Sequence, residues 1–506
     1  MDYSVIPVPV LSVLDALKAN GYQGHIVGGC VRDLLLGREP KDWDITTDAR
    51  PDAVLAIFPE SFYENDFGTV GVKVEPFHKN GRPDREHDVI EVTTYRTESE
   101  YSDKRRPDRV AFVTSLTEDL SRRDFTMNAI ALEVIEADPP ISTSRTIDIV
   151  DPFHGQDDIR ERLIRTVGNP EQRFGEDALR MIRAVRLYAE LRETGPGSTG
   201  AWKIDTATLA AAKKHAGLLA HVSRERVRDE FSKIILSDSP SEGVELLRTT
   251  RLLSDIIPEL EEGVDVGQNL HHTFTVYEHN LRALMHCPSR KLEVRLASLL
   301  HDIGKPKTKR GNGYRSTFYN HDHVGARMTR AILVRLRYPV SVIEQVTMLV
   351  DNHLFYYNVG EVTEASVRRL IRRVGLGNMK DLMDVRIADR LGSGVPKAKP
   401  YKLRHLEYMI DKVSKDPVSV KMLAINGSDL IKGLSMDAGP RIGAVLDVLL
   451  SEVIENPSLN TRETLLSRAE VLSAEDLATL RDQAKDAIEE KRERDDKGIR
   501  NRHKVA

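Results

Sequence analysis

The sequence predicts an α+β protein in which a mixed head precedes a long all-helical part. Residues 1 to about 160 combine short helical stretches with strand-like alternation, as in "DWDITT", "TVGVKVE" and "HDVIEVTTY". From about residue 165 onward, apolar residues recur with helical periodicity, as in "GEDALRMIRAVRLYAEL". Two breaks, "ETGPGSTG" and the Lys- and Pro-rich "GVPKAKPYK", interrupt the helical part. The pattern therefore favours several domains in succession.

The elements of the head can be read in order. "HIVGG" is typical of a buried strand that ends in a turn, and "CVRDLLLG" of a short helix that Gly37 ends. Strands are expected at "DWDITT", "TVGVKVE", "HDVIEVTTY" and "RVAFV", with a polar hairpin loop in "PFHKNGRPDREHD". After the head, helices such as "SRERVRDEFSKIIL" follow, and another helical block runs from about His271 to 390. The last twenty residues have mixed charge and are expected to form a frayed helix or tail.

Composition excludes several classes of protein. The chain has 506 residues, of which 40% are hydrophobic and 30% charged, so it can fill roughly three or four globular domains. Two cysteines, Cys30 and Cys287, exclude a disulfide framework and a four-cysteine zinc site, and they suit a reducing cytoplasm. The N-terminal residues do not resemble a signal peptide, and no apolar run reaches membrane-spanning length. We therefore expect a cytoplasmic protein without a membrane partner.

A stretch near the N-terminus, "IVGGCVRDLLLGREPKDWDITTDA", contains two closely spaced acids. On a strand, residues i and i+2 face the same side, so Asp42 and Asp44 project together, and Trp43 is expected to face the core. Two carboxylates at this spacing suit Mg²⁺, a hard cation that binds a few carboxylates together with phosphate oxygens of a substrate. The pattern predicts a site for phosphoryl or nucleotidyl transfer.

The residues before the acid pair indicate a phosphate. Gly28 and Gly29 have no side chains, so backbone N–H groups ahead of the next helix can approach a phosphate closely. Arg32 lies on the first turn of that helix and is expected to hold a triphosphate, with Asp33 orienting it. The plainer alternative is a tight turn followed by a surface strand, because two acids separated by one residue are common.

A second motif, "LSRRDFTMNAI", places two arginines and an acid before an apolar run. Guanidinium groups bind phosphate bidentately, and a carboxylate can accept a hydrogen bond from a ribose hydroxyl. Arg122, Arg123 and Asp124 therefore suit a nucleotide. A salt-bridged helix start explains the same residues equally well, because an acid is favoured there.

A third motif, "GEDALRMIRAVR", carries Asp177 and Arg180 one turn apart, adjacent on the surface of the predicted helix. Such a pair is most often a surface salt bridge that contributes little. It can also read the Watson–Crick edge of a base, accepting from an amino group and donating to a ring nitrogen or carbonyl. Residues 160 to 235 contain 15 Lys and Arg against 10 Asp and Glu, which suits an RNA-facing surface despite the net charge of −4.

Three stretches in order resemble the successive motifs of one enzyme family: "GGCVRDLLLGREPKDWDI", "SLTEDLSRRDFTMNAIAL" and "DPFHGQDDIRERLIRTVGNPEQRFGEDALRMIRAVRLYAEL". The family is the bacterial class II tRNA nucleotidyltransferases, the CCA-adding enzymes and their poly(A) polymerase relatives. The resemblance covers nearly all of residues 25 to 235. It implies a polymerase-beta-like nucleotidyltransferase head that uses Mg²⁺. It also implies an all-helical neck that selects CTP and then ATP with protein side chains.

The same resemblance implies roles for single residues. Asp42 and Asp44 are expected to be the catalytic metal ligands, and Glu91 on a neighbouring strand is a candidate third carboxylate. Asp177 and Arg180 are expected to select the base, and Asn128 to support the site. The nucleotide-binding positions implied are Gly28, Gly29, Arg32, Arg123, Asp124, Asp177, Arg180, Arg183 and Arg186.

A histidine-rich block follows the neck, in "VYEHNLRAL" and "VRLASLLHDIGKPKTK". An adjacent His-Asp pair after an apolar helix, preceded by a histidine on another helix, resembles the HD phosphohydrolase superfamily. This resemblance implies a divalent metal site with the ligands His279, His301, Asp302 and Asp389. Imidazole and carboxylate together suit Mn²⁺, Ni²⁺ or Fe²⁺.

Other residues of the block compete for this role or add to it. His272 is an alternative first ligand, and Lys305 is placed to contact a phosphate. Scattered histidines are more often surface or core residues, so each alone is a weak signal. Three further histidines accompany the motif: His321, His323 and His353.

We therefore expect four domains: a catalytic head (1–160), a neck for nucleotide selection and RNA binding (161–265), an HD metal-binding domain (270–392) and a tRNA-binding body and tail (393–506). The leading interpretation is a CCA tRNA nucleotidyltransferase that adds CMP, CMP and AMP to the tRNA 3′ end from CTP and ATP. One alternative is a poly(A) polymerase or an enzyme that adds only CC or only A. Another is an HD phosphohydrolase whose head only binds nucleotide or RNA, and a third is a non-catalytic RNA-binding module.

Overall fold

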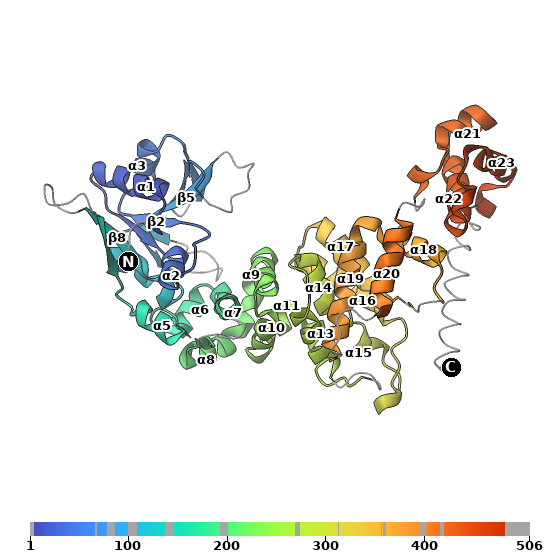
Figure 1. The fold of residues 1–506 in the computed structure, drawn as a ribbon. Helices are drawn as coiled ribbons and strands as arrows, with labels where there is room; N and C mark the ends of the chain where they lie inside the picture. Colours follow the sequence, from blue (N-terminus) through green and yellow to red (C-terminus); the bar gives the residue numbers. More distant parts are fainter. Residues whose placement is uncertain are drawn as a thin grey trace.

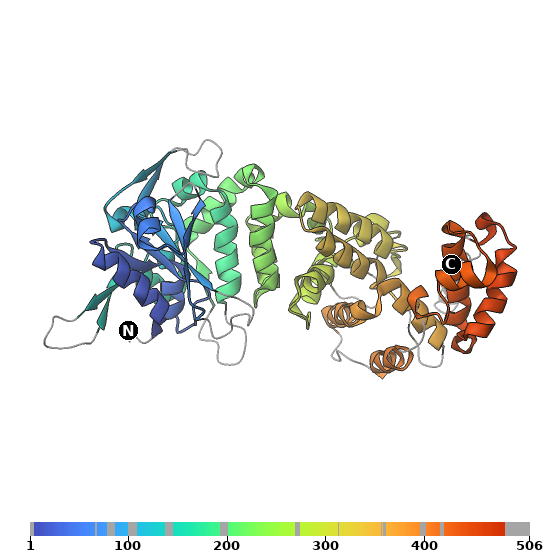
Figure 2. The ribbon, with the colours of Figure 1, turned by 90° about the horizontal axis from the view of Figure 1, so that it is seen from above.

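The computed structural model describes residues 5–65, 68–77, 87–99, 109–136, 145–192, 201–268, 274–311, 313–355, 357, 361–394, 401–414 and 419–480. Most of the expected hairpin loop, the break at "ETGPGSTG", His272 and the charged C-terminal tail lie outside these residues. The head, the helical neck, the HD region and the C-terminal helices follow one another along an elongated molecule (Figure 1, Figure 2).

A seven-stranded sheet forms the centre of the head, in the order β3-β4-β5-β2-β1-β8-β9. Neighbouring strands pair antiparallel, except for β2 and β5, which are parallel. The strands are β1 (Gly24–Val27), β2 (Asp44–Thr47), β3 (Ser61–Asn65), β4 (Thr69–Val74), β5 (Asp88–Thr94), β8 (Ala131–Glu136) and β9 (Arg145–Val150). A separate two-stranded ribbon pairs β6 (Arg96–Ser99) with β7 (Arg109–Phe112). The five strands expected from the sequence are present, whereas β3, β6, β8 and β9 were not anticipated.

Helices complete the head around this sheet. α1 (Val8–Ala19) and α3 (Pro51–Ile57) pack against each other and against the sheet, and α2 (Gly29–Leu35) follows β1. α4 (Leu116–Ser121) and α5 (Gly155–Glu161) lie on either side of β8 and β9 in the chain. Trp43 is only 3% exposed within the head core, which confirms that it faces inward between the two acids.

The neck consists of short helices, and one prediction about it is wrong. The stretch "GEDALRMIRAVRLYAEL" was expected to be one helix, but it divides into α6 (Pro170–Glu176) and α7 (Leu179–Leu191). Asp177 between them has an extended backbone, and its side chain accepts a hydrogen bond from Leu179 N (3.0 Å). An aspartate that caps a backbone N–H in this way ends one helix and begins the next. The other neck helices are α8 (Thr206–His215), α9 (Arg224–Leu236), α10 (Pro240–Thr249), α11 (Leu253–Ile256) and α12 (Pro258–Glu261).

The HD region continues the neck without a break in the apolar core, because one cluster of buried side chains extends from α6 to α20. Its helices are α13 (Val276–Met285), α14 (Leu292–Leu300), α15 (Lys305–Thr308), α16 (His321–Arg335), α17 (Val340–Asn352), α18 (Glu364–Val374), α19 (Met379–Gly392) and α20 (Tyr401–Val413).

The C-terminal helices α21 (Gly427–Leu434), α22 (Pro440–Glu455) and α23 (Arg462–Ser473) enclose a separate core. α18 contacts α22, and the buried Arg368 donates to the Ile454 carbonyl at its end (2.8 Å). Within the described part of the chain, every helix is too short or too polar to cross a membrane.

Candidate active site and metal centre

Three carboxylates meet where β2 and β5 run in parallel. Asp44 is the first residue of β2 and is the register partner of Glu91 on β5, so both side chains lie on the same face of the sheet. Asp42 is exposed just before the strand, while Trp43 turns inward. The structure therefore brings together the two predicted metal ligands and the candidate third carboxylate.

The charges at this edge repel one another. Burial raises the pKa of Asp44, and Asp42 and Glu64 raise it further, while Arg123 opposes them. Burial, followed by Asp44, Glu64 and Asp42, raises the pKa of Glu91 to about 7. Glu64 on β3 thus belongs to the acidic group, although no motif identified it. A divalent cation would relieve this repulsion, so the donor set fits Mg²⁺.

The Gly-Gly turn packs directly against the acids. Gly28 has a positive φ of 86°, which favours glycine. A Cβ atom at this position would lie 3.2 Å from Arg123 Nη1 and 3.3 Å from Asp44 Oδ2. At Gly29, the nearest atom to such a Cβ would be Arg32 Nη2 at 3.6 Å. The turn, the second motif and the acid pair therefore form one site.

Arg32 is held by two polar neighbours. Its Nε and Nη2 donate to Asp33 Oδ1 (2.9 and 2.8 Å), the pairing expected for an acid that orients the guanidinium. Its Nη1 donates to Asn128 Oδ1 (3.0 Å), and Asn128 Nδ2 in turn donates to Asp124 Oδ1 (3.0 Å). The first and second motifs are thereby joined through Asn128.

Asp124 connects the head to the neck. Arg183 Nε on α7 donates to Asp124 Oδ2 (2.8 Å). Burial alone would raise the pKa of Asp124, but Arg183 and the hydrogen bond from Asn128 hold it well below its usual range. Arg186, one turn later, lies 3.0 Å from the buried Glu230 of α9. Arg183 and Arg186 are thus both paired with protein carboxylates.

The prediction that Asp177 and Arg180 lie side by side on one helix is wrong. Arg180 belongs to α7, and its Nη1 donates to Glu176 Oε2 (2.7 Å), whereas Asp177 Oδ2 accepts from Arg226 of α9 (2.8 Å). The helix break at Asp177 separates the two side chains and gives each a different partner. Their role in base selection is a prediction that this geometry leaves open.

Asp119 is a residue of the site that no motif assigned. Its side chain is fully buried, and Oδ1 accepts from Arg122 Nε (2.9 Å) and Nη2 (2.8 Å). Oδ2 accepts from Arg123 Nη2 (3.4 Å) and Thr46 Oγ1 (3.1 Å). The available signal was an acid three and four residues before the two arginines, a spacing that pairs side chains on a helix.

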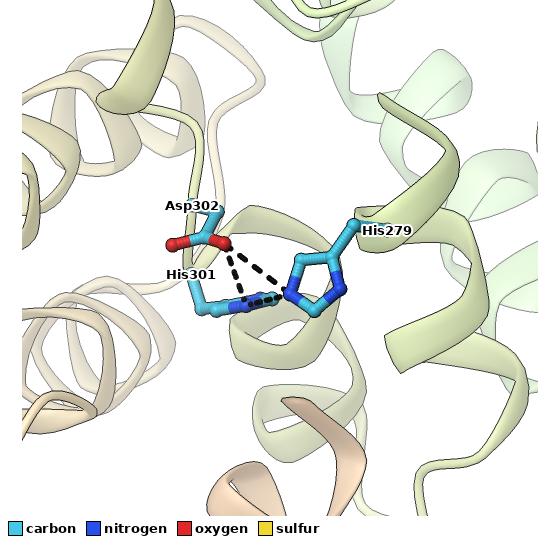
Figure 3. A group of neighbouring side chains, drawn as sticks. All are labelled: His279, His301 and Asp302. Atoms are coloured by element: carbon cyan, nitrogen blue, oxygen red, sulfur yellow. Dashed lines mark hydrogen bonds and ion pairs between the residues drawn. The ribbon is translucent and has the colours of Figure 1, made fainter. Parts of the chain in front are cut away.

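A second cluster lies in the HD region, where His279, His301 and Asp302 converge (Figure 3). Asp302 Oδ2 is 3.3 Å from Nε2 of each histidine, and the two Nε2 atoms are 3.0 Å apart. Asp389 Oδ1 lies 3.2 Å from His279 Nε2 and 3.7 Å from His301 Nε2. All four predicted ligands therefore meet, and the donor set of imidazole and carboxylate fits a divalent transition metal.

Two opposing effects set the pKa values in this cluster: burial, and the attraction between neighbouring groups of opposite charge. Burial disfavours the charged form of His301, but Asp302 and Asp389 outweigh it and raise the pKa of His301 to about 10. Burial would raise the pKa of Asp302, but His301 and the ammonium of Lys305, 2.6 Å from Oδ2, hold it well below its usual value. A bound metal ion would supply the positive charge beside the two carboxylates that the proton on His301 otherwise supplies.

Two glycines allow the helices to approach closely enough for this cluster. A Cβ on Gly304 would lie 2.2 Å from the His321 carbonyl oxygen, and one on Gly392 would lie 2.8 Å from Ala283 N. Gly304 therefore lets the turn after Asp302 pack on the start of α16. Gly392 lets α19, which carries Asp389, pack on α13.

Three family models match successive parts of the chain. The Poly A polymerase head domain matches residues 24–165, a probable RNA and SrmB-binding site of polymerase A matches residues 202–263, and the HD domain matches residues 269–393.

A CCA-adding enzyme from Geobacillus thermodenitrificans (strain NG80-2) is 33% identical over 90% of this chain and 94% of its own length. The chain belongs to the CCA-adding enzyme family. A CCA-adding enzyme from Geobacillus sp. (strain WCH70) is 44% identical over 48% of this chain and 52% of its own length. The crystal structure of Bacillus stearothermophilus CCA-adding enzyme in complex with CTP is 30% identical, with a TM-score of 0.64 over 93% of this chain and 98% of that chain.

These likenesses confirm the resemblance stated from the three motifs and the predicted α+β fold class with a nucleotidyltransferase head and a helical HD domain. In a CCA-adding enzyme the head is a nucleotidyltransferase. The roles of single residues are taken up below as proposals.

Proposed function

We propose that this CCA-adding enzyme adds CMP, CMP and AMP to the 3′ end of tRNA, using CTP and ATP and releasing pyrophosphate. The observation that carries the proposal is the acidic edge of the head, where Asp44 and Glu91 are register partners and Gly28 and Arg123 lie against Asp44. The similar Bacillus stearothermophilus enzyme, crystallised in complex with CTP, supports nucleotide binding by this fold. Two buried free cysteines support a cytoplasmic location.

The chain's own residues would prepare the reaction at this edge. Asp42 and Asp44, with Glu91 beside them, would hold Mg²⁺, which supplies activation of the 3′ hydroxyl and stabilisation of the leaving pyrophosphate when bound. Arg32 and Arg123 would orient the triphosphate, because both guanidiniums border the turn at Gly28 and Gly29.

Selection of the base would fall to the neck. Asp177 is paired with Arg226, and Arg180 is paired with Glu176. A nucleobase would replace these partners, with Asp177 accepting from it and Arg180 donating to it. Asp124 would accept from the ribose while Arg183 keeps it ionised. CTP and ATP would then be distinguished by protein side chains at the junction of α6 and α7.

Incubation of the purified protein with tRNA that lacks CCA tests this function. CTP alone should give two additions, and ATP should then give one. Long A tracts would instead support a poly(A) polymerase, and addition of only CC or only A would support a partial enzyme. The double substitution Asp42→Asn and Asp44→Asn should abolish addition, whereas the exposed Asp52→Asn on α3 should not. Addition that survives the double substitution would refute the proposed reaction centre.

The HD cluster favours a second candidate function. We propose that His279, His301, Asp302 and Asp389 hold a divalent metal and that the centre hydrolyses phosphoesters, with Lys305 contacting the phosphate. Release of nitrophenol from bis-p-nitrophenyl phosphate with added Mn²⁺ or Ni²⁺ measures this activity. His301→Ala should abolish the release and leave CCA addition unchanged, which separates it from the head. Hydrolysis that persists in His301→Ala would contradict the assignment.

A further inference from the structure

We propose that the head holds the 3′-terminal nucleotide of the RNA on the strands beside the acidic edge, with its base stacked on Phe62 and its phosphate paired with Lys73. The inference rests on the proposed function and names the place of its RNA substrate. Phe62 lies on β3 and Lys73 on β4. Neither residue belongs to the motifs from which the nucleotide site was predicted.

A row of register partners leads across the sheet from the acidic edge to Phe62. Asp44 on β2 pairs with Glu91 on β5. Glu91 in turn pairs with Gly71 on β4, and Gly71 pairs with Phe62 on β3. Because register partners present their side chains on the same face of a sheet, Phe62 shares a face with the two acids.

The opposite face of these strands is covered by the head core. Val70 and Val72, on either side of Gly71, are buried in that core. β5 has the same alternation, because the residues on either side of Glu91 are buried while Glu91 itself is exposed. The row that contains the acids and Phe62 therefore lies on the open face of the sheet.

Gly71 allows the Phe62 ring to lie against the sheet. A Cβ atom added to Gly71 would be 2.5 Å from Cζ, 2.9 Å from Cε1 and 3.0 Å from Cε2 of Phe62. The ring thus occupies the place that a side chain at position 71 would take, next to Glu91. The spacing of neighbouring strands puts this place about 10 Å from Asp44. The acids can therefore be reached by the ribose of a nucleotide whose base lies on the ring.

An aromatic ring over a glycine can also serve only to cover the sheet. Two observations favour a ligand in addition. Phe62 remains 40% exposed although one side of its ring lies on Gly71. Lys73, two residues after Gly71 on the same face, is exposed, and its ammonium has no ion-pair or hydrogen-bond partner among the residues that the structure describes. An exposed aromatic ring beside an unpaired cation suits a nucleotide, which offers a base for stacking and a phosphate for pairing.

The side of the acids on which Phe62 lies indicates which nucleotide it holds. Gly28 follows β1 and packs against Asp44, with Arg123 beside it, and β1 is the neighbour of β2 on the side away from β5. These groups are proposed to hold the triphosphate. In phosphoryl transfer the attacking and leaving oxygens are roughly in line. Pyrophosphate that leaves on the β1 side requires the 3′ hydroxyl to approach from the β5 side, where Phe62 lies.

A stacking surface also suits an RNA end that changes at every addition. Stacking on an aromatic ring tolerates any base, because every base has a π-face. Phe62 should therefore contribute equally whether the RNA ends before CCA, in C or in CC. Selection of the incoming base would remain with the neck.

Fluorescence of 2-aminopurine, placed at the 3′-terminal position of a tRNA that lacks CCA, tests the stacking without nucleotide and without reaction. At saturating protein, the wild type should quench this base. Phe62→Leu should remove most of the quenching, and Phe62→Tyr should retain it. Tyr63→Leu is the matched control, since Tyr63 is 44% exposed on the same strand but pairs with the buried Val70. Equal quenching by the wild type and Phe62→Leu would overturn the stacking.

Kinetics of CMP addition separate a contact with RNA from a purely structural role. Phe62→Leu should raise the KM for tRNA by about 5- to 100-fold, the range expected for one lost base stack, and leave the KM for CTP unchanged. A lower melting temperature without a change in the KM for tRNA would show that the ring only covers the sheet. A rise in the KM for CTP instead would place the incoming nucleotide on Phe62 and overturn the proposal.

The salt dependence of tRNA binding tests the phosphate contact. Lys73→Ala should weaken binding and lower the slope of log Kd against log salt concentration by about one. Lys18→Ala is the control, since Lys18 is exposed on α1, which packs on the core face of the sheet. An unchanged slope in Lys73→Ala would overturn this contact.

Failure of this inference can be distinguished from failure of the proposed function. A wild type that extends no tRNA would overturn the function and the inference with it. Normal addition of CCA by Phe62→Leu and Lys73→Ala, with the KM for tRNA of the wild type, would overturn the inference alone. Thermal unfolding of each variant checks the fold. Gly71→Ala, which displaces the ring without changing it, replaces Phe62→Leu if that variant unfolds.

Discussion

Asp119 is fully buried, and its two oxygens accept hydrogen bonds from Arg122, Arg123 and Thr46. It also accepts from the backbone of Arg96, the first residue of β6 (3.4 Å). The Asp119 carboxylate thus connects the two arginines of the second motif to Thr46 of β2, the strand that begins at Asp44. We expect Asp119→Asn to leave the acid pair in place but Arg123 misplaced, because an amide can donate toward the arginines instead of accepting from them.

The expected effect of Asp119→Asn is a fall in kcat/KM for CTP of about 10- to 100-fold, the range that follows from small misplacements of positioned groups. Single-nucleotide incorporation kinetics, with kcat and KM determined separately, provide the measurement. Glu118→Gln on the same helix is the matched control, since that side chain is exposed. Equal effects of the two substitutions would show that Asp119 does not position Arg123.

His25 makes the head sensitive to acid. The ring is 6% exposed, and its Nδ1 lies 2.7 Å from Tyr95 Oη. Burial lowers the pKa of His25 below its ordinary value of 6.5, although Glu133 and Asp48 oppose the shift. The unfolded chain therefore takes up this proton first as the pH falls. The contribution of His25 to the free energy of unfolding should be fully present above pH 6.5. Below pH 6.5 it should decline, by at most about 1.4 kcal/mol per pH unit.

Urea unfolding of the wild type and of His25→Gln between pH 8 and pH 5.5, followed by tryptophan fluorescence, measures this contribution. Both tryptophans are buried in the head core, Trp43 from the head itself and Trp202 from the neck segment that packs on it, so they report the unfolding of this core. The stability difference between the two proteins should shrink below pH 6.5. A difference that is constant with pH would refute the assignment.

Sequence alone could predict single residues where local spacing carries the chemistry. The acid pair at Asp42 and Asp44 and the His-Asp pair at His301 are visible because neighbours in sequence remain neighbours in space. The pairing of Asp119 with Arg122 and Arg123 could have been read from their spacing, but its contact with Thr46, 73 positions away along the chain, could not. The approach of His321 and His353 to the second oxygen of Asp302 was missed for the same reason, since separate helices bring these histidines to it.

At the scale of elements, the turn between β1 and α2 is the most constrained part of the head. Gly28→Ala would impose a positive φ on a residue with a side chain and place its Cβ 3.2 Å from Arg123 Nη1 and 3.3 Å from Asp44 Oδ2. We expect a loss of about 1 kcal/mol of stability from the backbone alone. Displacement of Arg123 and Asp44 should also lower the rate of nucleotide addition by more than about tenfold.

Gly37→Ala, at the end of the same helix, separates these two effects. Gly37 also has a positive φ (68°), but a Cβ added to it would meet no heavy atom within 4 Å. The substitution should therefore cost similar stability and leave catalysis unchanged. Thermal unfolding and CTP incorporation by both variants check this. Comparable loss of activity in Gly37→Ala would show that backbone strain, not contact with the site, explains the effect.

Helices and strands could be predicted where the spacing of apolar residues is regular. They could not be predicted where contacts between distant parts of the chain determine the pairing of strands or the end of a helix. The strands at "DWDITT" and "HDVIEVTTY" follow from alternation, but their parallel pairing, which aligns Asp44 with Glu91, requires the strand order of the whole sheet. The helix over "GEDALRMIRAVRLYAEL" was predicted as continuous because its apolar period is unbroken. The hydrogen bond from Leu179 N to the Asp177 side chain divides this stretch into two helices, and the spacing of apolar residues gives no sign of such a bond.

At the scale of the whole molecule, most of the neck shares one apolar core with the HD region, and the C-terminal helices have their own. The head core also includes one side of α7, through Ala184, Leu187 and Leu191. A shared core predicts that the neck and the HD region unfold together. Arg295 on α14 joins them: it is 5% exposed, and its Nη1 donates to the carbonyls of Ile235 (2.7 Å) and Ser237 (2.8 Å) at the end of α9.

We expect Arg295→Leu to destabilise this shared unit by about 2 to 4 kcal/mol, because the carbonyl oxygens of Ile235, Ser237 and Ser289 lose the donors that Arg295 supplies. Urea unfolding followed by circular dichroism at 222 nm reports the helical unit, and tryptophan fluorescence reports the head. The helical transition should shift to lower urea by more than the fluorescence transition, because α7 also contributes to the head core that the tryptophans report. Arg290→Leu is the control, since its side chain is 70% exposed and pairs with the exposed Asp238, and exposed pairs contribute under about 1 kcal/mol. A helical transition that splits in two in Arg295→Leu, or one that shifts equally in Arg290→Leu, would contradict a single neck–HD unit held by this arginine.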